Sequence, residues 1–125
     1  MTKNAAIHQF FSSFGLKAYP SASVPTSGDE MPEFPYLTYS VSTSSDMDVV
    51  PCDASLWYRT ESWLEINAKV EQISQTIGRS YMLECDDGGI IVRKGTPFAQ
   101  PMGDDTDNMI KRKILSFELT FVTVN

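Results

Sequence analysis

The segment from Ser62 to Gly78 constrains the fold more than any other part of the sequence. Its apolar residues recur at alternating intervals of three and four, which is the buried stripe of an amphipathic helix. These residues are Trp63, Ile66, Val70, Ile73 and Ile77. Ser62 and Glu65 have the spacing of an N-terminal capping box, and Gly78 is suited to end the helix. The rest of the chain must therefore provide a core for one face of this helix.

A second helix is predicted near the N-terminus, from Asn4 to Phe14. Its apolar positions fall at i, i+3, i+4 and i+7 on one helical face, and they are Ile7, Phe10, Phe11 and Phe14. Gly15 follows at the position where left-handed backbone commonly ends a helix. A helix this short does not persist alone, so we expect the same core to hold its Phe stripe.

The remaining segments have the alternating pattern of half-buried strands. We expect strands at Pro35–Ser42, Asp53–Thr60 and Lys113–Val124, an edge strand near Tyr19–Pro20, and a hairpin of Ser80–Cys85 with Ile90–Lys94 around the DDGG turn. Two helices on one face of a mostly antiparallel sheet would bury all of these stripes together. The sequence therefore predicts a single α+β domain over residues 1–125.

The segment from Gly95 to Arg112 is predicted to be a long loop, because it combines Pro, Gly and a run of acids between two strands. Loops of this length in compact domains are usually functional or disordered. It carries Phe98, Met102 and Met109, which suit a patch that a neighbouring protein buries. For Phe98 a second interpretation stays open, in which the ring packs on its own core and anchors the loop.

Charge excludes two classes of function. The formal net charge of −6 argues against a protein that binds nucleic acid by neutralising phosphates, and against docking on an anionic membrane. The N-terminus has no signal-peptide pattern, and no apolar run is long enough to span a bilayer. The two cysteines, Cys52 and Cys85, are therefore expected to be reduced thiols in a cytoplasmic setting.

No pattern of residues indicates catalysis. Asp104, Asp105 and Asp107 are carboxylates that a hard cation would accept, but the calcium-loop spacing fails and solvated loop acids are the simpler interpretation. His8 is the only histidine and has no acid placed to orient it. Phosphate-binding glycine loops and paired C-x-x-C cysteines do not occur. We expect no enzyme activity, no cofactor and no bound metal.

The sequence resembles the tail terminator proteins of long-tailed phages and Gram-positive prophages, also described as tail completion or head–tail joining proteins. The resemblance runs from about Phe34 to Val124. It rests on FPYLTYS, on WYR at 57–59 followed by SWLEI, and on the stretch that includes RKGTPFAQPMGDD and leads into the final strand.

That resemblance implies a small subunit that assembles as a homohexameric ring in the virion, after a period in the host cytoplasm. Such a ring caps the tail tube, stops its polymerisation, contacts the head–tail connector and lets DNA pass without specific binding. A head-completion or stopper protein of the same assembly is the nearest alternative. A small divalent-metal-dependent hydrolase or ligand-binding domain is the alternative from another class.

Residue type gives candidates for the surfaces of such a ring. Aromatic, Met and Arg side chains dominate interface energetics, so the candidate subunit or partner interface is Trp57, Tyr58, Arg59, Phe98, Met102 and Met109. Because Trp57 and Tyr58 are adjacent in a strand, we expect one to serve the core and the other to face a partner. The candidate acids for the lumen or rim of the channel are Asp104, Asp105 and Asp107.

Overall fold

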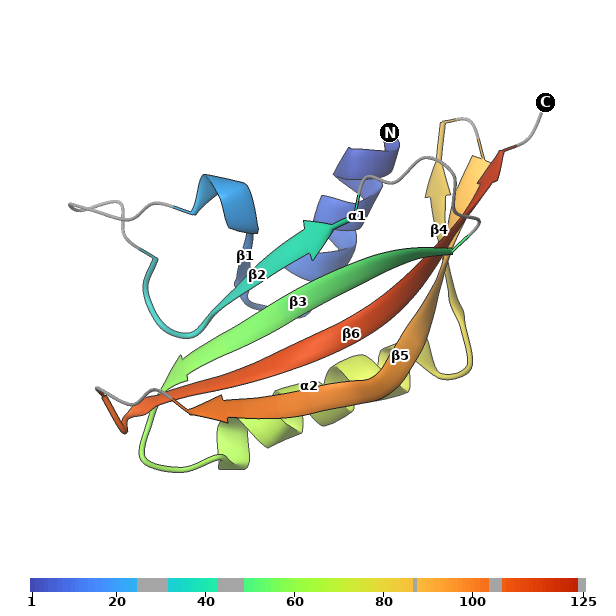
Figure 1. Cartoon of the computed structure of the whole chain (residues 1–125). Coiled ribbons are helices and arrows are strands. Elements are labelled where there is room, and N and C mark those ends of the chain that lie inside the picture. The colour runs from blue at the N-terminus through green and yellow to red at the C-terminus, as the bar shows by residue number, and fades with distance from the viewer. Residues whose placement is uncertain (25–31, 43–48, 87, 104–106, 124–125) are drawn as a thin grey trace.

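The computed structural model describes residues 1–24, 32–42, 49–86, 88–103 and 107–123. Within these ranges the chain forms an α+β fold with two α-helices and a mostly antiparallel sheet, as the sequence predicts. The helices and strands are α1 (Lys3–Ser12), β1 (Lys17–Pro20), the 3-10 helix η1 (Ser21–Ser23), β2 (Tyr36–Val41), β3 (Val49–Arg59), α2 (Leu64–Ile77), β4 (Tyr81–Cys85), β5 (Gly88–Gly103) and β6 (Ile110–Thr123) (Figure 1).

The sheet has six strands in the order β1-β2-β3-β6-β5-β4. The short edge strand β1 pairs with β2 in parallel, and every other pair of strands in the described sheet is antiparallel. The last strand of the chain, β6, therefore lies in the interior of the sheet. It pairs with β3 on one side and with β5 on the other along most of its length.

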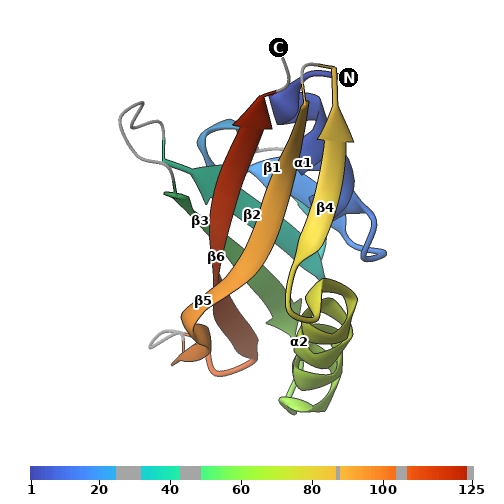
Figure 2. The same ribbon diagram turned by 90° about the vertical axis from the view of Figure 1, so that its right-hand side faces the viewer.

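Both helices pack on the same face of the sheet. In Figure 1 the strands pass in front of α1 and α2, and in Figure 2 α1 lies behind β4 and β5 while α2 lies at the lower right. The predicted stripes of the two helices join one core with the inward residues of the strands, since Phe11, Ile66 and Ile73 are at most 2% exposed. The ring of Phe11 in α1 packs against the ring of Phe117 in β6, with 5.5 Å between the two ring centroids. The prediction of two helices on one face is confirmed.

The N-terminus of α2 differs from its prediction. The helix begins at Leu64, with Trp63 at the capping position and no capping hydrogen bond from its side chain. Ser62 Oγ accepts the Leu64 N–H at 3.1 Å, so this hydroxyl closes the turn before the helix. The predicted capping box between Ser62 and Glu65 does not describe how the helix starts. The difference arises because the capping position falls on Trp63, which has helical backbone angles, and so lies one residue later than predicted.

The predicted loop over residues 95–112 is wrong over most of its length. Residues from Gly95 to Gly103 continue β5, and β6 already begins at Ile110. A register shift between Lys94 and Ala99 lets the strand bend and then pair again with β6. Pairing between β4 and β5 spans Gly88 to Val92, so the proline-containing half of β5 lies at the edge of the described sheet. Proline is tolerated at such an edge, which is why sequence alone suggested a loop.

Candidate functional site

The sheet face opposite the helices carries one continuous row of large side chains. We call this face the open face, because no described helix covers it (Figure 1). Adjacent strands β2, β3, β6 and β5 place Tyr36, Trp57, Arg112 and Met102 directly opposite one another in the sheet register. We call these four residues the aromatic–arginine row. Met102 at its end is 43% exposed, and the other three are partly buried.

Stacking and hydrogen bonds hold the aromatic–arginine row in place. The Tyr36 and Trp57 rings are stacked, with centroids 5.9 Å apart and planes inclined by 11°. The guanidinium carbon of Arg112 lies 4.4 Å from the centroid of the Trp57 ring. Trp57 Nε1 donates to Thr38 Oγ1 at 3.0 Å, and Arg112 Nε and Nη2 both donate to Ser55 Oγ at 3.1 Å. Tyr36, Trp57 and Arg112 are therefore held in place before any partner arrives, which lowers the entropy cost of binding.

Two further aromatic rings extend the row at the Tyr36 end. Tyr19 of β1 contacts Tyr36 edge-on at 6.2 Å, and Phe34 lies 5.2 Å from the same ring. Burial raises the pKa of the Tyr36 hydroxyl above its usual value, and the nearby positive charge of Arg112 partly offsets that rise. This tyrosine is therefore neutral at physiological pH.

The stacking also bears on which partner the row fits. Trp57 has Tyr36 on one neighbouring strand and Arg112 on the other, so its ring faces are already in contact within the subunit. Proteins that bind single-stranded nucleic acid offer free ring faces on which bases stack. Here the faces of the Trp57 ring are already occupied, and the chain carries a net charge of −6. Such a surface fits contact with another protein better than stacking with nucleic-acid bases.

Two of the predicted interface residues, Trp57 and Met102, lie in this row. Tyr58 lies on the other face of β3 and is only 5% exposed, so it belongs to the core and is corrected as an interface candidate. The expectation that Trp57 and Tyr58 point to opposite faces is confirmed. Burial raises the pKa of the Tyr58 hydroxyl, with a smaller contribution from Glu65.

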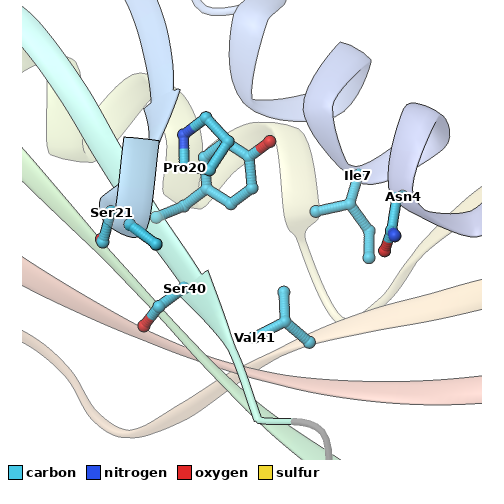
Figure 3. Close-up of a pocket in the computed structure, with 8 residues that line it drawn as sticks. Asn4, Ile7, Pro20, Ser21, Ser40 and Val41 are labelled. Carbon is cyan, nitrogen blue, oxygen red and sulfur yellow. The ribbon is translucent and has the colours of Figure 1, made fainter. Parts of the chain in front are cut away.

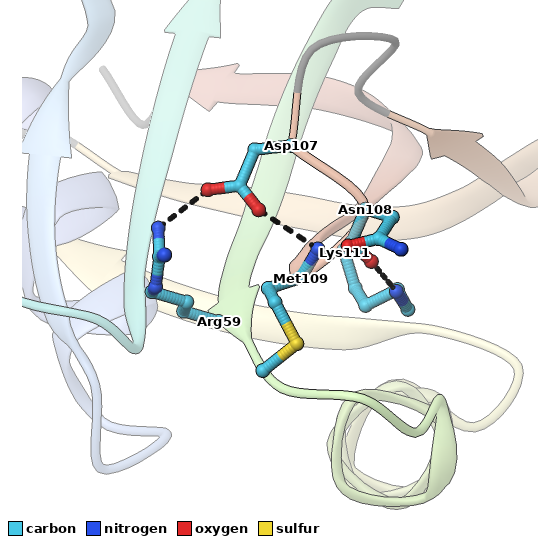
Figure 4. Close-up of polar contacts among 5 residues, drawn as sticks. All are labelled: Arg59, Asp107, Asn108, Met109 and Lys111. Carbon is cyan, nitrogen blue, oxygen red and sulfur yellow. Dashed lines mark hydrogen bonds and ion pairs between the residues drawn. The ribbon is translucent and has the colours of Figure 1, made fainter.

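Arg59 and Asp107 pair with each other at one end of β3. Arg59 Nη1 lies 2.5 Å from Asp107 Oδ2, and Asp107 Oδ1 accepts the Met109 N–H at 2.9 Å (Figure 4). The Thr60 N–H donates to the Met109 carbonyl oxygen at 2.7 Å. These contacts join β3 to the start of β6. Asp107 therefore has a role within the subunit, which weakens the hypothesis that it is a rim acid, whereas Asp104 and Asp105 lie outside the described residues.

The remaining candidates, Phe98 and Met109, are partly buried. The Phe98 ring meets Phe117 of the core edge-on at 5.5 Å, and Lys94 Nζ lies 5.7 Å from the centroid of the Phe98 ring. Phe98 thus anchors the bent half of β5 to its own core, which is the second interpretation given for this residue. Met109 supplies the backbone groups that connect β6 to Asp107 and Thr60.

Sequence reasoning missed Arg112 as part of the site. The run KRK at 111–113 alternates between the two faces once it lies in β6, so that Arg112 meets Trp57 while Lys111 and Lys113 approach the Trp63 ring on the helix side. Strand alternation could have placed Arg112 on the opposite face from Lys111 and Lys113. The sequence could not have predicted that Arg112 lies opposite Trp57, because the two residues are far apart in sequence and the register is set in the folded sheet.

The described residues do not bring catalytic groups together. His8 Nδ1 lies 2.9 Å from the Tyr39 hydroxyl, so its described hydrogen-bond partner is a phenol and not a carboxylate. Cys52 is buried in the core, and burial raises its thiol pKa to about 12, so it is a poor nucleophile at neutral pH. No group of three or more His, Cys, Asp or Glu side chains in the described ranges is arranged to hold a metal ion.

A hollow of about 510 Å³ lies between α1 and β2. Ile7, Tyr39 and Val41 give it an apolar wall, and Asn4, Ser21 and Ser40 lie around it (Figure 3). Among the described residues, no charged side chain lines it.

No protein-family model and no curated protein matches this sequence. Among the described residues, no helix combines the length and apolar character that crossing a membrane requires.

Proposed function

We propose that this protein is a phage or prophage tail terminator: a virion subunit that forms a homohexameric ring on the end of the tail tube. The ring stops polymerisation of the tube and joins it to the head–tail connector. Its partners are copies of itself, the major tail tube protein and the connector protein. The protein acts at the head–tail junction of the virion and has no enzymatic role.

The observation that carries this proposal is the aromatic–arginine row on the open face of the sheet. A monomer gains nothing from keeping Met102 exposed beside Trp57 and Arg112, whereas these are residue types that dominate protein interfaces. The α+β fold, and the sequence resemblance over about Phe34 to Val124, agree with a small assembly subunit of this kind.

The charge also agrees with a conduit for DNA. A ring of six copies carries a formal charge of about −36, which gives the duplex little reason to bind. The proposal predicts that DNA passes through the ring without specific contacts. Changing Asp104 and Asp105 to Lys should make DNA bind the assembled ring in a salt-dependent way if these acids face the channel.

The proposal is tested by mass in solution and by the effect on tail tubes. Light scattering over a range of concentrations, with negative-stain images of any large species, should show a hexamer with a central hole. Adding the protein to polymerising tail tube protein of the same phage should shorten the tubes and place a ring at one end. Tubes of unchanged length, with no protein bound at their ends, would overturn the proposal.

The metal-dependent alternative has its own test. A divalent ion that binds only the native protein raises apparent stability, so Mg²⁺, Ca²⁺ and Mn²⁺ should each be added at millimolar concentration during thermal unfolding. We expect no shift in Tm beyond that of a matched NaCl control. A shift that disappears when Asp104 and Asp105 are changed to Asn would favour the alternative.

A further inference from the structure

The aromatic–arginine row and the outer side of α2 carry charged side chains of opposite sign. We infer that the outer side of α2 from one copy docks on the aromatic–arginine row of the next copy. This inference rests on the proposed ring and names the contact that builds it. The occupant of the open face is therefore a second copy of this chain, in a head-to-tail arrangement.

Positive side chains outnumber acids at the end of the open face that holds the row, as far as the described residues show. Lys17 of β1 lies opposite Tyr36 in register and is exposed, so it extends the row with a second positive charge beside that of Arg112. Arg59 lies on the same face and is paired with Asp107. The next row across the same face contains no acid and consists of Tyr19, Thr38, Ser55, Ile114 and Gln100. Asp53 and Glu118 come further along this face on β3 and β6, and Glu84 lies on it in β4.

The outer side of α2 is acidic and carries an apolar side chain that its own subunit does not cover. Leu64 is 76% exposed at the start of the helix. Glu61, Glu65 and Glu71 are exposed around or beyond it. The single basic residue of the helix is Lys69, whose Nζ donates to the Phe14 carbonyl oxygen at 2.7 Å and to Gln72 Oε1 at 2.8 Å. Its charge is thus directed toward its own subunit. Glu71 Oε1 accepts a hydrogen bond from Gln75 Nε2 at 3.1 Å, and its side chain is exposed.

The two surfaces lie on opposite sides of the subunit. α2 packs on one face of the sheet, and the aromatic–arginine row lies on the other, because Trp57 alternates with the buried Leu56 and Tyr58 of the core. A contact between unlike surfaces leaves one of each unused at the two ends of a dimer, so it propagates to further copies. Such heterologous contacts close into rings when the rotation between subunits allows. In this arrangement, α2 of the neighbouring copy would cover the open face of each subunit. Stable architectures commonly cover the face of a sheet with helices or with a second sheet.

Charge exchange between two variants tests this contact. The first variant is Arg112→Glu, and the second combines Glu61→Lys with Glu65→Lys. Each alone places like charges across the proposed contact, so self-association should weaken by about tenfold or more. In an equimolar mixture the open face of the first variant meets the helix of the second, and these two surfaces are again opposite in charge. The unchanged open face of the second variant likewise meets the unchanged acidic helix of the first. Sedimentation velocity should show self-association regained only in the mixture.

Controls separate this effect from general charge and from folding. Arg79→Glu makes the same change of charge at an exposed position beyond the end of α2, and it should associate as the parent does. Leu64→Ala should weaken association while leaving the Tm of the monomer nearly unchanged, because the side chain is mostly exposed. If Arg112→Glu does not fold, Lys17→Glu combined with Met102→Glu replaces it, since neither side chain is buried.

The outcomes are distinct from those of the tail-tube experiment. A mixture that associates no better than the single variants overturns the contact. A parent that forms rings while Arg112→Glu forms them equally well also overturns it and leaves the proposed function standing. A parent that stays monomeric up to millimolar concentration overturns it as well, and a different protein is then the partner of the open face.

Discussion

Arg112 and Trp57 form a fixed pair on the open face of the sheet. The guanidinium carbon lies 4.4 Å from the ring centroid, while two guanidinium nitrogens donate to Ser55 Oγ at 3.1 Å. An arginine on a protein surface normally samples many rotamers, and ordering one during binding costs free energy. Here the subunit has already ordered it, on neighbouring strands that arise from distant parts of the sequence.

This pair should show a measurable energetic coupling. We expect Trp57→Ala and Arg112→Ala each to lower the free energy of unfolding by about 1–2 kcal/mol, because stacking and hydrogen bonds are lost. The double variant should cost less than the sum, with a coupling of about 0.5–1 kcal/mol from the cation–π contact. Urea denaturation of the four proteins measures it. Strict additivity would contradict the pair.

Gly95 should not tolerate a side chain. A Cβ built there would lie 2.9 Å from Ser116 Cβ and 3.2 Å from the Ser116 carbonyl carbon, so the bent part of β5 would have to move away from β6. We expect Gly95→Ala to lower the free energy of unfolding by about 1–3 kcal/mol. Gly103→Ala is the matched control in the same strand, because nothing lies within 4 Å of its Cβ position. Equal stability of the two variants would refute the close approach.

Asp107 should matter for its backbone contact more than for its ion pair. Asp107→Asn removes the charge pairing with Arg59, which is half exposed, and should cost less than about 1 kcal/mol. The Asn oxygen can still accept the Met109 N–H. Asp107→Ala removes both contacts and should cost about 1–2 kcal/mol. Thermal and urea unfolding compare the two, and an Asn variant as unstable as the Ala variant would argue for the ion pair instead.

Stability should fall at alkaline pH, and Cys52 should contribute to the fall. Burial raises the pKa of this thiol from 9.0 to about 12, so below pH 9 it is protonated in both the folded and the unfolded state. Between pH 9 and about pH 12 the thiol loses its proton in the unfolded chain but keeps it in the folded protein. This difference favours unfolding by about 1 kcal/mol between pH 9 and pH 10. Buried tyrosines, whose pKa values are also raised, add to the loss above pH 10.

A cysteine variant isolates this contribution. Cys52→Ala should be less stable at neutral pH by about 1 kcal/mol, because it leaves a small cavity. Between pH 9 and pH 10 its stability should decline less steeply than that of the parent. Urea denaturation at each pH makes the comparison. Parallel declines in the two proteins would assign the alkaline loss to other groups.

Much of the fold was predictable because its signals are local. The helical stripe that includes Ile66, Ile73 and Ile77, the DDGG turn and the alternation in the last strand each depend on residues close in sequence. The stretch from Gly95 to Gly103 was not predictable, since its proline content favours a loop locally. Pairing with β6 overrides that preference, because the edge of a sheet tolerates proline.

The candidate site divides in the same way. Residue type pointed to Trp57 and Met102, and strand alternation placed Trp57 and Tyr58 on opposite faces. The sequence by itself thus determined the amphipathic stripes, the fold class and the net negative charge, because these depend on composition and short-range periodicity. Only the tertiary structure decided that Arg112 stacks on Trp57 and that Asp107 pairs with Arg59, because the register between distant strands follows from packing of the whole core.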